Sequence, residues 1–168
     1  LKAKLYLFEK LIKKRGNIIT DEKIPEFKKI KNIANNKNLN LFSLLDKKNN
    51  FQFLSHQYEG ESQLLEIKYK NSIHKIKLNL IGKVQFKNVL MAVIASIKSS
   101  INIKDILNII PKIKSVEGRF EKVGRIKNNS KVILDYAHTP DALKTCLKNI
   151  KEQFPGQKIT LVFGCGGN

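Results

Sequence analysis

Apolar and polar residues recur with a helical period at the start of the chain. The apolar positions are Leu5, Phe8, Leu11 and Ile12, with lysines between them. This spacing predicts an amphipathic helix over 3–14, capped by Gly16, and the apolar run at 17–20 predicts a short buried strand. Asp21 opens a second expected helix, which has Pro25 in its first turn and runs to about Asn35. A strand near 39–44 completes a helix–strand alternation that indicates α/β winding.

Between residues 50 and 80 the period changes to two. Apolar and polar residues alternate over 51–55 and 65–69, and more loosely over 73–80. Asn71-Ser72 is typical of a hairpin turn. The pattern predicts a two- or three-stranded antiparallel meander on the edge of the sheet.

Gly82 ends this meander, and helical spacing returns after it. One side of the segment 86–100 is apolar, which predicts a strongly buried helix. The apolar positions are Val89, Leu90, Val93, Ile94 and Ile97. A second helix is expected over 103–113, interrupted by Pro111.

The last fifty residues predict the opening of a Rossmann-like unit. Residues 116–126 are expected to be extended, and 131–134 to form a buried strand. A helix over 140–153, with Thr139 as its N-cap, leads to a second buried strand over 158–163 and a glycine-rich loop. The best boundary between domains lies at 115–118.

Composition and charge narrow the class of protein. With 42% hydrophobic and 27% charged residues the chain is typical of a soluble globular protein, and no apolar run reaches the ~18 residues of a membrane helix. The net charge of +18 raises the question of nucleic-acid binding. However, only three of the 32 basic residues are arginine, and the lysines are dispersed, which favours a solvated surface. A lysine-rich nucleic-acid-binding module stays the alternative from another class, and a salt titration of DNA binding would reveal it.

Cysteine usage and the chain ends add two expectations. Cys146 and Cys165 do not form a C-x-x-C pair, so we expect reduced thiols in a cytoplasmic protein. The chain starts at Leu1 without an initiator Met and stops inside a glycine-rich turn. We therefore expect an internal segment of a longer protein.

Candidate chemistry gathers after the strand at 131–134. Asp135, Tyr136 and His138 follow this strand directly, at the edge where ligands bind in open α/β sheets. An Asp there can accept hydrogen bonds from ribose hydroxyls. The alternative is a helix-capping acid and a structural histidine. The loop Gly164-Cys165-Gly166-Gly167-Asn168 could bring backbone N–H groups to an anion, or could be an ordinary turn.

Two earlier motifs could meet a nucleotide as well. Arg119, in Gly118-Arg119, is one of the few arginines of a lysine-rich chain and suits a bidentate phosphate contact, or it is a surface residue near a domain junction. Gln85 and Asn88 enter the buried helix, where polar side chains can meet a base or phosphate, or simply cap the helix.

Taken in order, these motifs resemble the Mur ligase family. The segment 135–141 followed by the 164–168 loop carries most of the resemblance, which is closest to the member that acts on UDP-MurNAc-L-Ala-D-Glu. The resemblance implies an α/β fold. Residues 1–117 would be the C-terminal part of the central ATPase domain, a mixed sheet with an antiparallel meander. Residues 118–168 would be the first β-α-β of a Rossmann-like C-terminal domain.

The resemblance also implies roles for individual residues. Asn88 matches the asparagine near the adenine, and Asp135 the acid that holds the ribose. Arg119 matches the arginine that reaches the ATP phosphates on domain closure and acts in catalysis. Tyr136 and His138 are expected to line the same cleft. The loop of Gly164, Cys165, Gly166, Gly167 and Asn168 matches the start of the amino-acid-binding segment.

The activity implied is ATP-dependent amide-bond formation in peptidoglycan synthesis, with ATP and Mg²⁺ as cofactors. UDP-MurNAc-dipeptide and the third amino acid, meso-diaminopimelate or L-lysine, are the expected substrates. Another Mur-type or a folylpolyglutamate-type ligase is the alternative within the class. A cytoplasmic monomer that binds no nucleic acid and does not insert into membranes is expected. The P-loop, the magnesium ligands and the carbamylated lysine would precede Leu1, so no metal site is expected in this segment.

Overall fold

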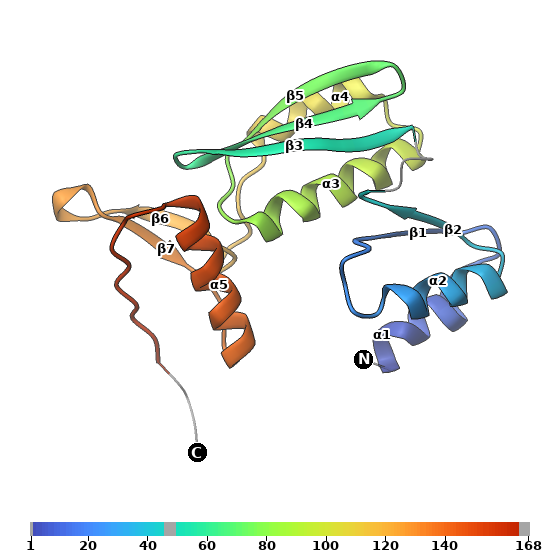
Figure 1. Cartoon of the computed structure of the whole chain (residues 1–168), viewed down its shortest axis with the longest axis horizontal. Helices are drawn as coiled ribbons and strands as arrows, with labels where there is room; N and C mark the ends of the chain where they lie inside the picture. The colour runs from blue at the N-terminus through green and yellow to red at the C-terminus, as the bar shows by residue number, and fades with distance from the viewer. Residues whose placement is uncertain (1, 46–49, 165–168) are drawn as a thin grey trace.

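A computed structural model describes residues 2–45 and 50–164, which fold as a small parallel sheet, an antiparallel meander on two helices, and a final hairpin with one helix (Figure 1). The first unit comprises α1 (Lys2–Tyr6), one π-helical turn (Leu7–Leu11), β1 (Asn17–Thr20), α2 (Phe27–Asn36) and β2 (Asn40–Ser43). β1 and β2 pair in parallel, with Ile18 opposite Leu41. Both predicted strands are therefore confirmed, and Ile18 packs with Ile30 and Ala34 of α2.

Two predicted helix limits in this unit were wrong. The first helix ends at Leu11 rather than residue 14. The second begins at Phe27 rather than at Asp21, because the Asp21 carboxylate accepts the Lys23 N–H (3.0 Å) and holds the segment in a turn. Pro25 also disfavours helical geometry in the residue before it.

The predicted meander is confirmed with three strands, β3 (Phe51–Glu59), β4 (Ser62–Tyr69) and β5 (Ser72–Leu78). It forms a sheet of its own, so its expected place on the edge of the first sheet was wrong. The second hairpin turn lies at Lys70-Asn71, one residue earlier than predicted, because Tyr69 pairs with Ser72. Lys70 takes the positive φ of 53° that this tight turn needs.

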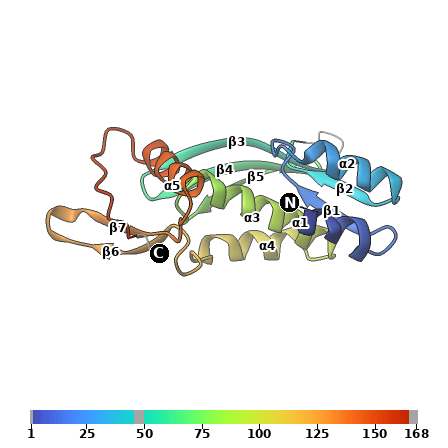
Figure 2. The ribbon, with the colours of Figure 1, turned by 90° about the horizontal axis from the view of Figure 1, so that it is seen from below.

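Two helices cover one face of the meander. They are α3 (Lys83–Lys98) and α4 (Ile103–Ile109), and α4 passes into a 3₁₀ turn (Ile110–Lys112) at the predicted interruption by Pro111. Figure 2 shows both helices beneath the strands. The apolar side of α3 packs into the same hydrophobic core as the meander. It contributes five buried residues, Phe86, Val89, Leu90, Val93 and Ile94. The predicted buried helix is thus confirmed, beginning three residues earlier than expected.

The final unit contains β6 (Glu121–Arg125), a 3₁₀ turn (Lys127–Asn129), β7 (Lys131–Leu134) and α5 (Pro140–Gln153). Of the predicted extended segment 116–126 only β6 is a strand, and it pairs antiparallel with β7. The predicted N-cap of α5 is confirmed, since Thr139 Oγ1 accepts the Ala142 N–H at 3.3 Å. Within the two described ranges, no helix has both the length and the apolar character needed to cross a bilayer.

The two buried strands expected in this unit are not buried. Leu134 at the end of β7 is half exposed, and residues 158–163 form no strand. A strand needs a neighbour for its N–H and C=O groups, and in the part of the chain that the structure describes β7 pairs with β6 alone. The second strand of the expected β-α-β is therefore absent here, and Val162 and Phe163 lie exposed.

Candidate functional site

Two backbone segments of the final unit lie side by side and carry four of the candidate residues. The Tyr136 N–H donates to the Gly118 carbonyl (2.8 Å), which joins the end of β7 to the turn before β6. The Phe120 N–H donates to Asp135 Oδ2 (2.9 Å) and the Ala137 N–H to Asp135 Oδ1 (3.0 Å). The structure thus brings Arg119, Asp135 and Tyr136 together.

The Asp135 carboxylate is held in one orientation by these two hydrogen bonds. It sits half-buried at the C-terminal end of β7, and each oxygen accepts one N–H from the residues that the structure describes. An ionised carboxylate offers about four lone-pair positions, so acceptor capacity remains for two hydroxyl donors. A fixed, partly buried carboxylate with free lone pairs fits a vicinal diol such as that of ribose.

Arg119 sits between two residues with left-handed backbone, Gly118 (φ 65°) and Phe120 (φ 47°). A bulky side chain rarely adopts such a φ, and the burial of the Phe120 ring offsets the strain. The Arg119 side chain is exposed, and its guanidinium has no ion pair or hydrogen bond with the residues that the structure describes. The backbone of this turn therefore contacts Asp135 through the Phe120 N–H, while the arginine side chain is exposed.

Helix α3 reaches this turn through its first residues. The Gln85 side-chain amide donates to the Arg119 carbonyl at 3.1 Å. Asn88 lies three residues further on, on the same helix face, and is exposed. The structure hence places Asn88 one helical turn from the contact with the Arg119 segment, on the same side of α3.

Tyr136 and His138 are both exposed, and their rings lie 4.9 Å apart in a tilted arrangement. His138 Nδ1 lies 3.0 Å from the Tyr136 carbonyl. The pair forms a polar and aromatic surface next to Asp135.

Only Gly164 of the glycine loop lies within the described residues. Gly164 is exposed at the end of the unpaired segment, and Cys165, Gly166, Gly167 and Asn168 lie outside the described residues. Among residues 2–45 and 50–164, no group of three or more His, Cys, Asp or Glu side chains is placed to hold a metal ion.

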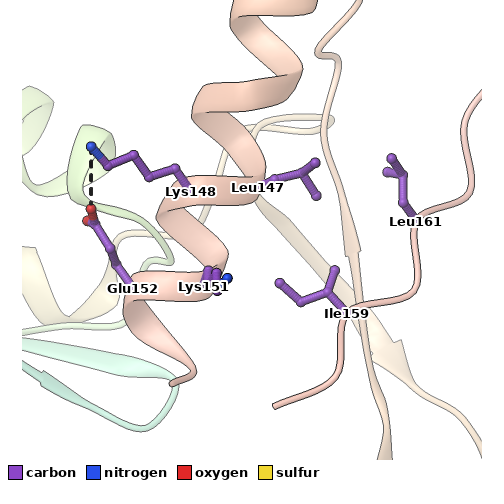
Figure 3. A pocket seen from close by; sticks show the side chains of 6 residues that line it. All are labelled: Leu147, Lys148, Lys151, Glu152, Ile159 and Leu161. Atoms are coloured by element: carbon purple, nitrogen blue, oxygen red, sulfur yellow. Dashed lines mark ion pairs between the residues drawn. The ribbon is translucent and has the colours of Figure 1, made fainter. Parts of the chain in front are cut away.

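Two cavities lie elsewhere, and neither is lined by the candidate residues. One separates α5 from the last segment, where Ile159 and Leu161 face Leu147 across open space (Figure 3). The other lies between β3 and the end of α5, and its lining includes His56, Tyr58 and Glu152. Because Arg119, Tyr136 and His138 are exposed, the cluster around Asp135 lies at an open surface.

Sequence reasoning missed two amides of α5 that contact the start of α3. Asn149 and Gln153 are 6% and 2% exposed, and their oxygens accept the Val84 and Gly82 N–H groups. Their spacing held a signal, since they share the inward helix face with Cys146 and Ile150 at intervals of three and four. Polar residues at core positions of an amphipathic helix indicate a specific buried partner.

A buried ion pair was missed as well. Asp21, 8% exposed at the end of β1, pairs with Lys87 of α3, the neighbour of Asn88. Burial raises the pKa of the Asp21 carboxyl, but the hydrogen bonds from Lys87 and the Lys23 N–H and their charges outweigh it, so the net pKa lies below its ordinary value.

Two family models match this chain, one before and one after the start of the final unit. Residues 1–96 match the Mur ligase middle domain, and residues 118–168 match the Mur ligase glutamate ligase domain. The chain belongs to the Mur ligase family. The resemblance drawn from the motifs is therefore confirmed. The meander, α3 and the first sheet lie within or next to the middle-domain match, and the Arg119–Asp135 cluster lies within the other.

Curated relatives in the Mur ligase family include UDP-N-acetylmuramoyl-L-alanyl-D-glutamate–2,6-diaminopimelate ligases. That of Rickettsia montanensis is 32% identical over 171 residues, covering 100% of this chain and 34% of the relative. That of Fusobacterium nucleatum is 41% identical over 107 residues, covering 62% of this chain and 21% of the relative. The chain thus spans about a third or less of the length of these relatives.

Solved structures confirm the fold. MurF from Acinetobacter baumannii superposes with a TM-score of 0.71 at 16% identity, covering 85% of this chain and 30% of that one. A UDP-N-acetylmuramoyl-L-alanyl-D-glutamate–2,6-diaminopimelate ligase gives 0.70 at 22% identity, covering 99% and 34%. Folylpolyglutamate synthetase from Lactobacillus casei gives 0.68 at 15% identity, covering 92% and 40%. The predicted Mur-type α/β architecture is therefore correct.

Proposed function

We propose that the protein containing this chain is the ATP-dependent ligase that adds the third amino acid, meso-diaminopimelate, to UDP-MurNAc-L-Ala-D-Glu in peptidoglycan synthesis. The observation that carries the proposal is the contact of the Arg119 turn with a fixed acid, in which the Phe120 N–H donates to Asp135 Oδ2 while the Arg119 side chain is exposed. The two curated diaminopimelate ligases named above, which match over 100% and 62% of this chain, support the same substrate.

In this proposal residues 1–117 belong to the central domain and 118–168 to the C-terminal domain. Asn88 contacts the adenine, Asp135 accepts the ribose hydroxyls, and Tyr136 and His138 line the same surface. Arg119 contacts the phosphates, because its guanidinium is exposed and unpaired within the described residues. The 164–168 loop begins the amino-acid-binding segment.

The proposed reaction has two steps. The substrate carboxylate attacks the γ-phosphoryl group of ATP, giving an acyl phosphate and ADP, and the amine of the third amino acid then displaces phosphate. Phosphoryl transfer depends on positioning and on charge neutralisation. Arg119 neutralises part of the developing charge, while Asp135 and Asn88 orient the nucleotide. Mg²⁺, when bound, would neutralise further phosphate charge.

The test is ligase activity of the full-length protein carrying Arg119→Ala or Asp135→Ala. We expect each change to lower kcat/KM for ATP by about 100-fold, equivalent to about 2.7 kcal/mol of transition-state stabilisation. Lys127→Ala at the hairpin tip and Asp105→Ala on α4 are matched exposed controls and should leave turnover unchanged. Near-normal kcat/KM in both site variants would refute the proposed site.

Two further assays test the amino-acid substrate and the activity of the isolated chain. Comparing meso-diaminopimelate with L-lysine as the third amino acid identifies the substrate, and preference for lysine would correct it. The 168-residue chain alone should not hydrolyse ATP, because its sequence contains no P-loop motif. We further propose that the enzyme is a cytoplasmic monomer.

A further inference from the structure

The N-cap of helix α3 is Gly82, which has a φ of 90° and no side chain to cap the helix. The first N–H groups of a helix lack partners within the helix and need acceptors from elsewhere. Here α5 supplies them. The Gly82 N–H donates to Gln153 Oε1 at 2.7 Å, and the Val84 N–H donates to Asn149 Oδ1 at 3.2 Å. A helix that starts in the middle-domain part is thus capped by side chains 65 and 71 residues later.

The orientation of both amides is fixed by their nitrogens. Asn149 Nδ2 donates to the Thr145 carbonyl at 2.8 Å, and Gln153 Nε2 donates to the Gly60 carbonyl at 3.2 Å. Because the donor end of each amide is engaged elsewhere, the oxygen must face α3. Gln153 therefore links the first turn of the meander, the start of α3 and the end of α5.

The network extends beneath Gly82. Gln63, fully buried on β4, donates through Nε2 to the carbonyls of Leu80 (2.7 Å) and Gly82 (3.2 Å). Its Oε1 lies 2.8 Å from His56 Nε2 and accepts a hydrogen bond from it, since the amide nitrogen of Gln63 already donates to the two carbonyls. Burial lowers the pKa of His56. Above Gly82, a Cβ would meet the Phe120 ring at 3.3 Å and Asn149 at 3.4 Å. The backbone of residue 82 is thus enclosed on both sides.

We propose that Asn149 and Gln153 are positioning residues that set the orientation of α3 relative to α5. They thereby hold the Gln85–Asn88 face of α3 against the segment that carries Arg119 and Asp135. The polar contacts specify one orientation, which the small apolar cluster of Ile81, Phe120, Cys146 and Phe154 does not do by itself, because apolar packing is not directional. The inference rests on the proposed nucleotide site.

The test uses full-length protein with Gln153→Met and Asn149→Leu, which keep side-chain volume and remove the amide. We expect KM for ATP to rise about 10-fold while kcat changes less than about 3-fold, since nucleotide contacts split between α3 and the Asp135 segment are misaligned. Asn149→Asp keeps an acceptor for the Val84 N–H at the helix N-terminus but loses the donor to the Thr145 carbonyl, so its KM should lie between those of Asn149→Leu and wild type. Asn108→Leu, an exposed asparagine on α4, is the control.

Amide hydrogen exchange of residues 81–86 provides a readout that does not depend on activity. Loss of Gln153 or Asn149 should speed exchange at Gly82 and Val84 and leave the meander protected. Unchanged KM and unchanged exchange in a folded Asn149→Leu protein would overturn the proposal, and this variant decides if Gln153→Met does not fold. If exchange is faster in the variants but the wild-type protein has no ligase activity, the role of Asn149 and Gln153 at the interface stands and the proposed function is refuted.

Discussion

The meander with its two helices and the final hairpin with α5 differ in how much apolar surface they bury. Among the described residues, the first shares a cluster of fourteen buried side chains, whereas the second has four, one of which, Ile81, comes from the first part. The final unit compensates with polar contacts across the junction. Glu61 pairs with Lys122 and Arg125, and Gln153 and Asn149 cap α3.

This difference indicates that the final unit depends on the first for its orientation and for part of its stability. Four apolar residues of its last segment lie exposed, namely Ile159, Leu161, Val162 and Phe163, and β7 is covered incompletely. A cluster of four side chains contributes little hydrophobic stabilisation compared with one of fourteen, because the free energy scales with buried apolar area. We therefore expect core substitutions in the meander unit to destabilise the whole chain, and those in the final unit to open that unit alone.

The largest effect is expected from Leu90→Ala, in the middle of α3. Leu90 is fully buried in the large cluster, so its truncation should lower the free energy of unfolding by about 4 kcal/mol, through lost burial and a residual cavity. Urea unfolding of the full chain measures this loss. Leu54→Ala, an exposed leucine on β3, should change stability by less than about 0.5 kcal/mol. Equal losses in the two variants would mean that this core is not the main source of stability.

A more local effect is expected from Phe120→Ala. The ring anchors the Arg119 turn against Gly82, and its loss should cost about 3 kcal/mol, but chiefly as opening of the final unit. Amide exchange should accelerate over 121–153 and stay slow over 51–78. Phe163→Ala, with an exposed ring, serves as the control. Acceleration throughout the chain would show that the two units unfold together.

The two units also differ in what the sequence could predict. The limits of α5 were predicted correctly, because Thr139, Pro140 and Asp141 are local signals for a helix start. The strand expected over 158–163 did not form, because its hydrogen bonds would have to come from other strands, which a local apolar run does not specify. For the same reason the separate meander sheet could not be distinguished from an edge of the first one.

The candidate site divides in the same way. The position of Asp135 after a strand followed from local pattern. The turn around Arg119 did not, because residues 116–126 were expected to be extended. The acceptor role of Asn149 toward Val84 did not, because it depends on how α5 packs on α3 across 65 intervening positions. The pair of Asp21 and Lys87 is equally remote in sequence. The sequence shows polar residues on the apolar face of α5, but it does not show which groups they contact.

A moderate effect is expected from breaking the Asp21–Lys87 pair, which joins α3 to the first sheet. Asp21→Asn should cost about 1–2 kcal/mol, since both groups are largely removed from water. The folded-state pKa of Asp21 is lowered, so the pair stabilises fully above about pH 4 and its contribution is lost as pH falls through the folded-state value.

Stability measured at pH 7 and at pH 3 separates this contribution from others. The variant should be less stable than wild type at pH 7, and the gap should shrink at pH 3. Glu59→Gln breaks the pair of Glu59 with Lys77, in which both side chains are about half exposed, and should cost less than about 0.5 kcal/mol. A gap that does not change with pH would show that Asp21 acts through packing rather than charge.

The smallest effect is expected at Cys146, where the thiol reports on the junction without any substitution. Burial, with a smaller contribution from the charge of Asp135, raises the pKa of Cys146 to about 11. At pH 8 its thiolate fraction is then about 100-fold lower than that of a thiol of pKa 9, and burial slows reaction further. The rate of iodoacetamide labelling, followed by mass spectrometry of the Cys146 peptide, should be at least about 100-fold slower than in urea and should rise with pH up to about 11. Phe120→Ala should speed labelling by opening the cluster, whereas Leu54→Ala should not, and labelling of the wild type as fast as in urea would show that the small core is open in solution.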